Sequence, residues 1–280
     1  MKYNKSIKNV PLGFFKHAVF IIWSALTIYP IFFIIATALK SKEEYSFNKF
    51  GIPFEPTIDN VKNILFQTNF SRWILNSFIV TTISIAVSLI LSILAAYGLS
   101  RSKFLFRNPL INIIISLIVI PPIIMILPLF VFFNQVNLTN NYIGISIIFT
   151  GILIPFCIYS LLGFFKTIPS SLIESAYIDG ASSFKILIRI VIPLSGPAIA
   201  TLAVVNAIYV WNDLLISIVM MSKESLRTIM GGILQFASFY DLDVPLLMTG
   251  LALTTLPIIV LYFFTQRFFI RGLTSGALKE

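Results

Sequence analysis

Residues 167–197 read TIPSSLIESAYIDGASSFKILIRIVIPLSGP and form a polar stretch in an otherwise strongly apolar chain. Pro169 followed by two serines is typical of a helix start, and Ser171 with Glu174 three residues later fits a capping box. Gly180 stands where that helix should end, because glycine readily adopts the left-handed conformation that many helix ends need. The first half of the stretch therefore predicts one short, capped helix.

The second half predicts another short helix, which Ser182 or Ser183 can cap. Pro193 and Pro197 are expected to bend or end the chain's next helical segment, because proline has no backbone N–H to donate. The first helix carries one apolar stripe, formed by Leu172, Ile173, Ala176 and Tyr177. A helix, turn and helix with one apolar face indicates a docking surface.

The composition places the remaining chain in a membrane. Of its 280 residues, 58% are hydrophobic and only 11% are charged, and the mean hydropathy is +0.95; a soluble domain carries about a quarter charged residues. The net charge of +9 comes from scattered basic residues, which does not favour nucleic acid as a partner. One cysteine, Cys157, excludes an intrachain disulfide, and one histidine, His17, excludes a multi-histidine metal site. No metal site is expected.

Six segments are long and apolar enough to cross about 30 Å of hydrocarbon. The chain is therefore expected to be all-α, a single polytopic membrane domain over residues 1–280, with a loop at 167–189 and a tail at 267–280. Pro121, Pro122 and Pro128 in the third segment predict a kinked helix. The expected spans are about 14–39, 73–100, 108–133, 141–165, 190–221 and 244–266.

The basic residues predict the orientation, since Lys and Arg are enriched in cytoplasmic connections. With both termini in the cytoplasm, thirteen of the 20 Lys and Arg residues lie on the inner side. This orientation also places residues 167–189 in the cytoplasm.

The chain lacks the residues of several energy-coupling mechanisms. No Gly-Lys pair exists, so no phosphate-binding P-loop is present. Asp213 is the only acidic residue inside an expected span and lies near its outer end, which argues against a proton or ion relay at the midplane. A membrane-embedded enzyme has little support, because these residues assemble no metal centre or carboxylate pair. Amides such as Asn76, Asn112 and Asn206 are interpreted mainly as hydrogen bonds between helices.

With this topology, the opening stretch resembles the cytoplasmic EAA loop of permease subunits of bacterial ABC importers. The family pattern is EAA, three residues, G, nine residues and I-x-L-P, with Ser175 in place of an alanine and Ile192 in place of the leucine. The matching residues are Glu174, Ala176, Gly180, Ile190 and Pro193. Three further stretches are similar to the MalG-like permeases of maltose-type carbohydrate importers: ALKSKEE at 38–44, VWND at 210–213 and RGLTSGALKE at 271–280.

The resemblance implies a type I ABC importer permease in a bacterial cell membrane. Such a subunit is not an enzyme and forms half of the pathway for a sugar or oligosaccharide. The implied partners are a sister permease in a heterodimer, an ABC ATPase dimer that binds ATP and Mg, an extracellular sugar-binding protein and membrane lipid; this chain binds no cofactor. The alternatives are a permease for another solute, such as an amino sugar or a glycerol-phosphate compound, or an ion-coupled secondary transporter.

The resemblance also assigns roles to residues. Those of the loop would couple to the ATPase: Glu174, Ala176, Asp179, Gly180, Ala181 and Pro193. The C-terminal tail, which could also be a disordered basic segment, would contact the ATPases through Arg271, Gly272, Leu273, Thr274 and Gly276. The outer loop before the last span would contact the binding protein through Phe239, Tyr240 and Asp241. The translocation path would include Trp211, Asn212, Asp213 and Asn206, although the first three also fit an aromatic-belt anchor and helix caps.

Overall fold

The computed structural model describes residues 10–102, 104–237 and 242–277, and their side chains from residue 16 to residue 266. These residues are almost entirely helical, and the β-structure among them is one antiparallel bridge between Ala237 and Leu242. The chain divides into two units, Met1–Thr68 with Ile233–Leu253, and Asn69–Gly232 with Thr254–Glu280. An all-α membrane protein, as the composition predicts, is the observed fold class.

The first unit begins with the long helix α1 (Val10–Ala38) and continues through α2 (Lys42–Phe47) and α3 (Asp59–Gln67). It also contains η3 (Leu234–Phe236) and the first turns of α14 (Val244–Ala277). Phe20, Trp23 and Ile28 of α1 are each 60% or more exposed. Apolar side chains on all sides of one helix indicate a lipid-facing span.

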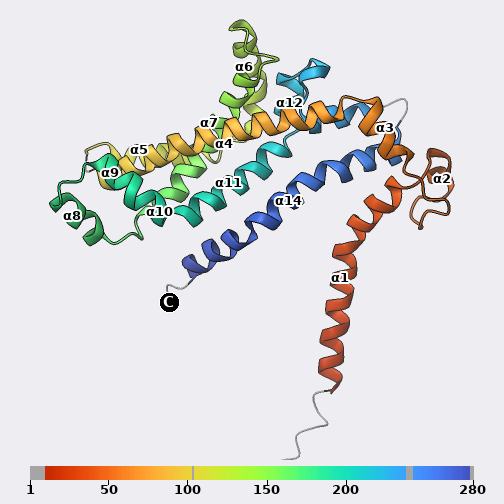
Figure 1. The fold of residues 1–280 in the computed structure, drawn as a ribbon, viewed down its shortest axis with the longest axis horizontal. Helices are drawn as coiled ribbons and strands as arrows, with labels where there is room; N and C mark the ends of the chain where they lie inside the picture. Colours follow the sequence, from red (N-terminus) through yellow and green to blue (C-terminus); the bar gives the residue numbers. More distant parts are fainter. Residues whose placement is uncertain (1–9, 103, 238–241, 278–280) are drawn as a thin grey trace, which may run out of the picture. The chain divides into compact units, whose positions relative to one another are not determined.

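The second unit is built on α4 (Phe70–Arg101) and α7 (Tyr142–Phe165), which run side by side with α11 (Gly196–Trp211) next to them (Figure 1). It ends with the part of α14 from Thr254 onward. The shorter elements are α5 (Arg107–Leu117), α6 (Pro122–Gln135), α8 (Ser170–Ile178), α9 (Ser183–Ile186), the π-helix η1 (Leu187–Val191), α10 (Ile192–Leu194), α12 (Leu215–Met220), η2 (Glu224–Leu226) and α13 (Ile229–Ile233).

Small hydroxyl side chains bring α4 and α7 together. Ser84, Ser88 and Ser92 repeat every four residues on one face of α4 and are fully buried. Ser92 Oγ donates to the Ile154 carbonyl at 3.5 Å, and Thr150 Oγ1 donates to the Ser84 carbonyl at 3.5 Å. In lipid, such close packing and interhelical hydrogen bonds replace the hydrophobic force that acts in water.

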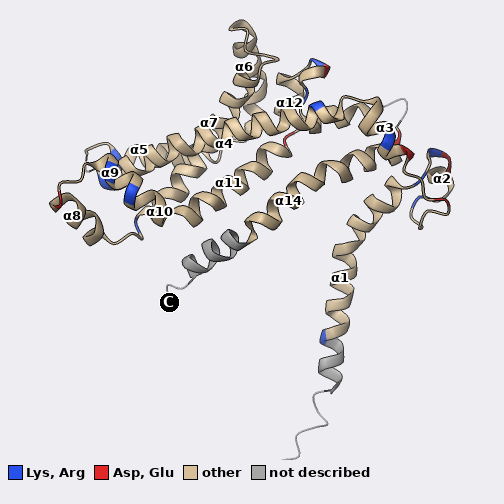
Figure 2. Cartoon of the chain, viewed as in Figure 1, with Lys and Arg blue, Asp and Glu red and all other residues tan. Residues whose placement is uncertain are grey.

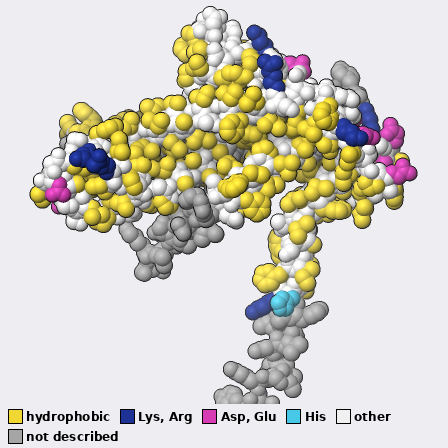
Figure 3. Space-filling view, in the orientation of Figure 1, with side chains coloured by type: hydrophobic (Ala, Val, Ile, Leu, Met, Phe, Trp, Pro, Cys, Tyr) yellow, Lys and Arg dark blue, Asp and Glu magenta, His cyan; other side chains and the backbone are white. Residues whose placement is uncertain are grey.

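Four described helices are long and apolar enough to span a membrane, and two bent pairs bring the number to as many as six. The helices at Lys16–Ala38, Phe70–Arg101, Tyr142–Phe165 and Val244–Gln266 agree with the expected spans. Charged residues gather at the helix ends (Figure 2), and hydrophobic side chains cover most of the visible helical surface (Figure 3). This distribution is that of helices solvated by hydrocarbon.

The third and fifth expected spans are bent pairs of helices rather than single helices. The segment 108–133, where a kink was predicted, is broken into α5 and α6, which meet at 94°, because Pro121 and Pro122 interrupt the backbone hydrogen bonds. The segment 190–221 is bent by 74° next to Ser195, and α12 is a separate helix after Asp213. The tail expected at 267–280 continues the backbone of α14 as helix through Ala277.

The connection after α1 is organised around one buried lysine. Lys40 is fully buried, and its Nζ donates to the Asn48 carbonyl at 2.6 Å. Asn60 Nδ2 donates to the carbonyls of Ala38 at 3.0 Å and Lys40 at 2.8 Å. The ALKSKEE stretch thus folds into a compact turn that includes α2.

Glu44 supplies the negative charge that balances Lys40. Its Oε1 accepts from the Phe54 N–H at 2.7 Å and from Asn48 Nδ2 at 3.0 Å. The Phe54 N–H lowers the pKa of Glu44 most, and Asn48, the Glu55 N–H and the Lys40 charge lower it further, against the opposing effect of burial. Folding lowers this pKa, so the stabilisation is complete above the ordinary Glu pKa and is lost as the pH falls through the folded value.

Glu44→Gln is expected to loosen the connection at neutral pH, because Lys40 then lacks its counter-charge. The hydrogen-exchange protection factor of the Phe54 amide should fall about tenfold, and in the wild type it should fall similarly when the pH drops well below the Glu pKa. Glu43→Gln, at the exposed neighbouring position, is the control and should change neither value. Equal protection in the two variants would contradict the role of Glu44.

Candidate functional site

Helix α8 ends in a complete Schellman motif. The Ala181 N–H donates to the Ala176 carbonyl at 2.9 Å, and the Gly180 N–H donates to the Tyr177 carbonyl at 3.0 Å. Gly180 has φ +76°, a conformation that side chains with a Cβ rarely adopt. The prediction of a glycine-terminated helix is confirmed. The two bonds of the motif explain the spacing of Ala176, Gly180 and Ala181.

The start of α8 differs from the predicted capping box. Pro169 with ψ 130° is the N-cap residue, and no side chain caps the described helix start. Ser171 is already the second helical residue, so its hydroxyl is past the position that can bond the free N–H groups. Pro169 determines the start of the helix, and the side chain of Glu174 is exposed.

The second helix begins as predicted. Ser182 Oγ accepts from the Lys185 N–H at 3.4 Å, which selects Ser182 over Ser183 as the cap. The helix then widens into the π-helix η1, where the Ile192 N–H donates to the Leu187 carbonyl. Pro193 follows directly and has no N–H for the Arg189 carbonyl, so the usual helical ladder cannot continue here.

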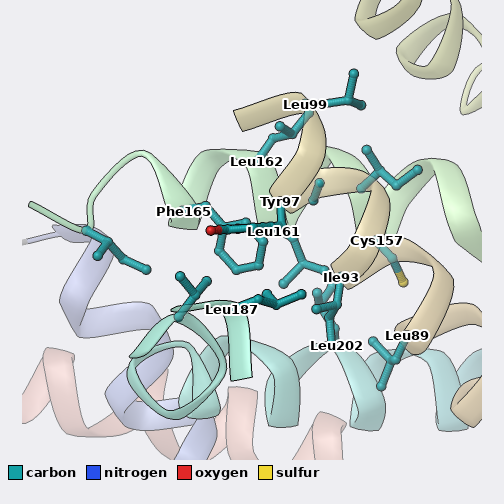
Figure 4. Close-up of a cluster of buried hydrophobic side chains, with 14 of the residues drawn as sticks. Leu89, Ile93, Tyr97, Leu99, Cys157, Leu161, Leu162, Phe165, Leu187 and Leu202 are labelled. Carbon is teal, nitrogen blue, oxygen red and sulfur yellow. The ribbon is translucent and has the colours of Figure 1, made fainter. Parts of the chain in front are cut away.

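A buried hydrophobic core joins this helical hairpin to the long helices. Ile173 of α8, Ile186 of α9 and Leu187 of η1 are each at most 4% exposed. Figure 4 shows Leu187 facing Tyr97 of α4 and the side chains of α7. Of the predicted stripe, Ile173 and Ala176 pack into this core, whereas Leu172 and Tyr177 are 45% and 46% exposed. Helix α8 therefore packs one face against the long helices and exposes an apolar edge, formed by Leu172 and Tyr177.

Two arginines satisfy the carbonyls where α4 and α7 end beside this core. Arg101 Nη2 donates to the Phe165 carbonyl at 3.3 Å, and Arg107 Nε donates to the Leu99 carbonyl at 2.6 Å. A guanidinium at a helix C-terminus also opposes the partial negative charge of the helix dipole. The capping role of Arg101 and Arg107 depends on the tertiary arrangement, and no local sequence pattern indicates it.

The VWND stretch makes structural contacts. Trp211 is 7% exposed and its Nε1 donates to the Thr254 carbonyl at 3.2 Å. Asn212 Nδ2 donates to the Ile208 carbonyl at 2.9 Å, and Asp213 Oδ1 accepts from the Ser217 N–H at 3.0 Å, within the first turn of α12. The bonds of Asn212 and Asp213 correspond to the alternative of helix caps, whereas Trp211 is buried inside the protein rather than exposed as an aromatic-belt anchor. A role in the translocation path stays a prediction.

Asn206 lies on a cavity that sequence reasoning did not find. Its Nδ2 donates to Cys157 Sγ at 3.0 Å, which joins α11 to α7. The cavity has a volume of about 510 Å³, and apolar side chains of α5, α6, α7 and α11 line it together with Asn206 and Tyr209. The lining comes from four helices in separate stretches of the chain, two of them on either side of the 94° break, so no local pattern indicates the cavity.

The remaining predicted site residues are only partly described. Phe239, Tyr240 and Asp241 lie outside the described residues. The tail residues belong to the helical backbone of α14, and their side chains lie outside the described part of the chain: Arg271, Gly272, Leu273, Thr274 and Gly276.

Residues 224–227, which precede α13, are bonded to α4 in a way that the sequence analysis did not predict. Trp73 and Asn76 of α4 bond to carbonyls of residues 224–227. Asn76 was interpreted as a hydrogen bond between helices, and it does accept from the Tyr142 hydroxyl of α7 at 2.7 Å. Its two further bonds reach a chain segment about 150 residues away, which no local pattern indicates.

Comparison with known proteins identifies the family. The family described as binding-protein-dependent transport system inner membrane component matches residues 88–275. A putative ABC transporter permease of Caldicellulosiruptor sp. is 34% identical over 259 residues, which cover 92% of this chain and 94% of that protein. A probable permease of a starch degradation products transport system of Thermoanaerobacterium thermosulfurigenes is 32% identical over 260 residues, covering 93% and 94%.

The fold has a solved counterpart as well. A chain of a bacterial ABC transporter involved in the import of the acidic polysaccharide alginate superposes with a TM-score of 0.80 at 22% identity, covering 96% of this chain and 100% of that one. This likeness shows the fold. Together with the family match, it establishes that the chain is a multi-pass inner membrane protein that belongs to the binding-protein-dependent transport system inner membrane components, the permease subunits of ABC importers.

Proposed function

We propose that this chain forms half of the translocation pathway of an ATP-driven importer for a sugar or oligosaccharide. The observation that carries the proposal is the α8–α9 hairpin, which is closed by Gly180 and anchored in the core of the long helices. The relatives named for starch degradation products and alginate support the class of cargo. A sister permease supplies the other half of the pathway.

In this proposal both termini and residues 167–189 lie in the cytoplasm. The hairpin docks on the ATPase with its exposed side, which includes Glu174, Asp179 and the 86% exposed Ile178. ATP and Mg are bound by that partner. The tail residues 271–276 provide a second contact with the ATPases, and the segment before the last span meets the extracellular binding protein.

The packing supports a mechanism of coupling. The hairpin contributes Ile173, Ile186 and Leu187 to a core that it shares with α4 and α7. Close-packed cores respond to displacement by moving as bodies rather than by deforming. When the ATPase moves α8, the ends of α4 and α7 move with it, and the pathway alternates between its outward-open and inward-open states.

Uptake by the assembled transporter tests the proposed cargo. Membrane vesicles that contain both permeases, the ATPase and the binding protein are expected to accumulate labelled oligosaccharides only with internal ATP. A panel of maltooligosaccharides, an amino-sugar disaccharide and a glycerol-phosphate compound separates the alternatives. ATP-dependent uptake of none of the sugars would contradict the proposal.

Gly180→Pro is expected to leave insertion and assembly intact but to uncouple ATP hydrolysis from uptake. Proline fixes φ near −65°, whereas Gly180 needs +76°, and the bond to the Tyr177 carbonyl is lost. Gly163→Ala is the control, because its added Cβ meets nothing within 4 Å. The ratio of transported sugar to hydrolysed ATP measures coupling, and a normal ratio in an assembled Gly180→Pro transporter would refute the assignment.

Glu174→Lys is expected to weaken binding of the ATPase about tenfold or more, an effect of at least ~1.4 kcal/mol. Glu174 is exposed, so reversal of its charge acts on the docked partner rather than on the packing of this chain. Glu43→Lys, at another exposed glutamate, is the control. Co-purification of the ATPase with both variants gives the comparison, and equal recovery would argue against docking at Glu174.

A further inference from the structure

Residues 222–232, which follow α12 and include most of α13, are held at the start of α4 by four side chains. These side chains, which we call the clamp, belong to the N-cap residue Asn69 and to Trp73, Asn76 and Ser77. Trp73 Nε1 donates to the Glu224 carbonyl at 3.1 Å, and Asn69 Nδ2 donates to Glu224 Oε1 at 2.8 Å. Ser77 Oγ accepts from the Ile229 N–H at 2.8 Å. Backbone groups of this segment, including the first N–H of α13, are thus paired by side chains at the start of the neighbouring helix.

Asn76 is the central residue of the clamp. It is 1% exposed, and its Nδ2 donates to the carbonyls of Ser225 at 3.0 Å and Arg227 at 2.8 Å. Its Oδ1 accepts from the Tyr142 hydroxyl at 2.7 Å. Both amide hydrogens and the carbonyl are therefore used, and a shorter side chain would leave several buried groups unpaired.

The clamped segment also fits tightly against the helix. A Cβ on Gly232 would overlap the Trp73 ring, whereas a Cβ on the neighbouring Gly231 would have no neighbour closer than 3.6 Å. From the other side, Asn140 Oδ1 accepts from the Lys223 N–H at 2.8 Å and Asn140 Nδ2 donates to Ser222 Oγ at 3.0 Å. Backbone and side-chain contacts together fix the position of this segment on α4.

The exposed edge of the segment is polar and charged. Ser222, Lys223 and Glu224 are exposed, although their backbone is held by the clamp and by Asn140. A held backbone with exposed charged side chains is preorganised for a protein partner, because little ordering entropy remains to be lost on binding.

The clamp and the coupling hairpin are attached to opposite ends of the same helix. α4 carries the clamp at its start and, about 20 residues further on, contributes Ile93, Tyr97 and Leu99 to the core that contains Ile173 and Leu187. α4 is one continuous helix of 32 residues and packs on α7 along this length. A displacement of the hairpin is therefore passed to the clamped segment without an intervening hinge.

We propose that Asn76 is a positioning residue, which fixes residues 222–232 so that their exposed edge meets the extracellular binding protein and moves with α4 as one body. The identity of the partner in this inference rests on the proposed function. The clamp rests only on the contacts described above. Asn76 acts through the segment that it holds and needs no contact with the sugar or with ATP.

The test uses the complete transporter in lipid nanodiscs with Asn76→Ala and Gly232→Ala, each beside a matched control. Asn134→Ala removes an exposed amide whose side-chain bond is to Thr139, and Gly231→Ala adds a methyl group where there is space. Hydrogen exchange of peptides that cover residues 222–232 reports on the clamp. Titration of the purified, sugar-loaded binding protein, read as stimulated ATP hydrolysis, reports on the partner.

In both clamp variants, exchange of the segment is expected to be about tenfold faster, and half-maximal stimulation to need about tenfold more binding protein. The maximal rate of ATP hydrolysis should stay within about twofold of the wild type, because the ATPase contacts are unchanged. A fall in the maximal rate alone would indicate a merely structural role and overturn the positioning role. The two control variants should match the wild type.

Unchanged exchange in Asn76→Ala and Gly232→Ala would overturn the clamp. Faster exchange with an unchanged half-saturating concentration would overturn the partner-facing role while the clamp stands. A wild-type transporter that no binding protein stimulates would instead overturn the proposed function and the role toward the partner, and the exchange data would still decide on the clamp.

Discussion

The close contact between α4 and α7 is the constraint on which the second unit depends. It exists because Ser84, Ser88 and Ser92 present small side chains at a spacing of four residues, so that the two backbones approach within reach of interhelical hydrogen bonds. Larger side chains at these positions would separate the helices. The coupling hairpin, α11 and the segment before α13 all pack on this pair, so its separation would remove the support of each.

At both ends of the pair, side chains stabilise helix ends and short connecting segments by bonding to their backbone groups. Beside the hairpin, Arg101 and Arg107 bond to the last carbonyls of α7 and α4, and Gly180 closes α8 with its own bonds. At the other end, Trp73 and Asn76 bond to carbonyls in and beside the short 3₁₀-helix η2. In a membrane protein an unpaired backbone group is expensive, which explains why side chains carry so many of these bonds.

Local sequence patterns predicted those features that arise from local chemistry. Gly180 takes the left-handed conformation, Ser182 caps the second helix, and the long apolar segments are helices. The capping box at Ser171 and Glu174 was wrong because Pro169 already determines where the helix begins. The double proline at 121 and 122 indicated a kink, but its 94° angle depends on the helices against which α5 and α6 pack.

The sequence by itself determined the class of the molecule: an apolar, all-helical membrane chain with a glycine-terminated helical hairpin of the ABC permease type. These conclusions follow from hydropathy, helix-end chemistry and motif spacing, all of which act over a few residues or along one helix. Tertiary structure alone decided that Asn76 holds residues 225 and 227, that Arg101 caps α7, and that Asn206 borders a cavity. These pairings join residues about 50 to 150 positions apart, and only the packing of the helices brings them within hydrogen-bonding distance.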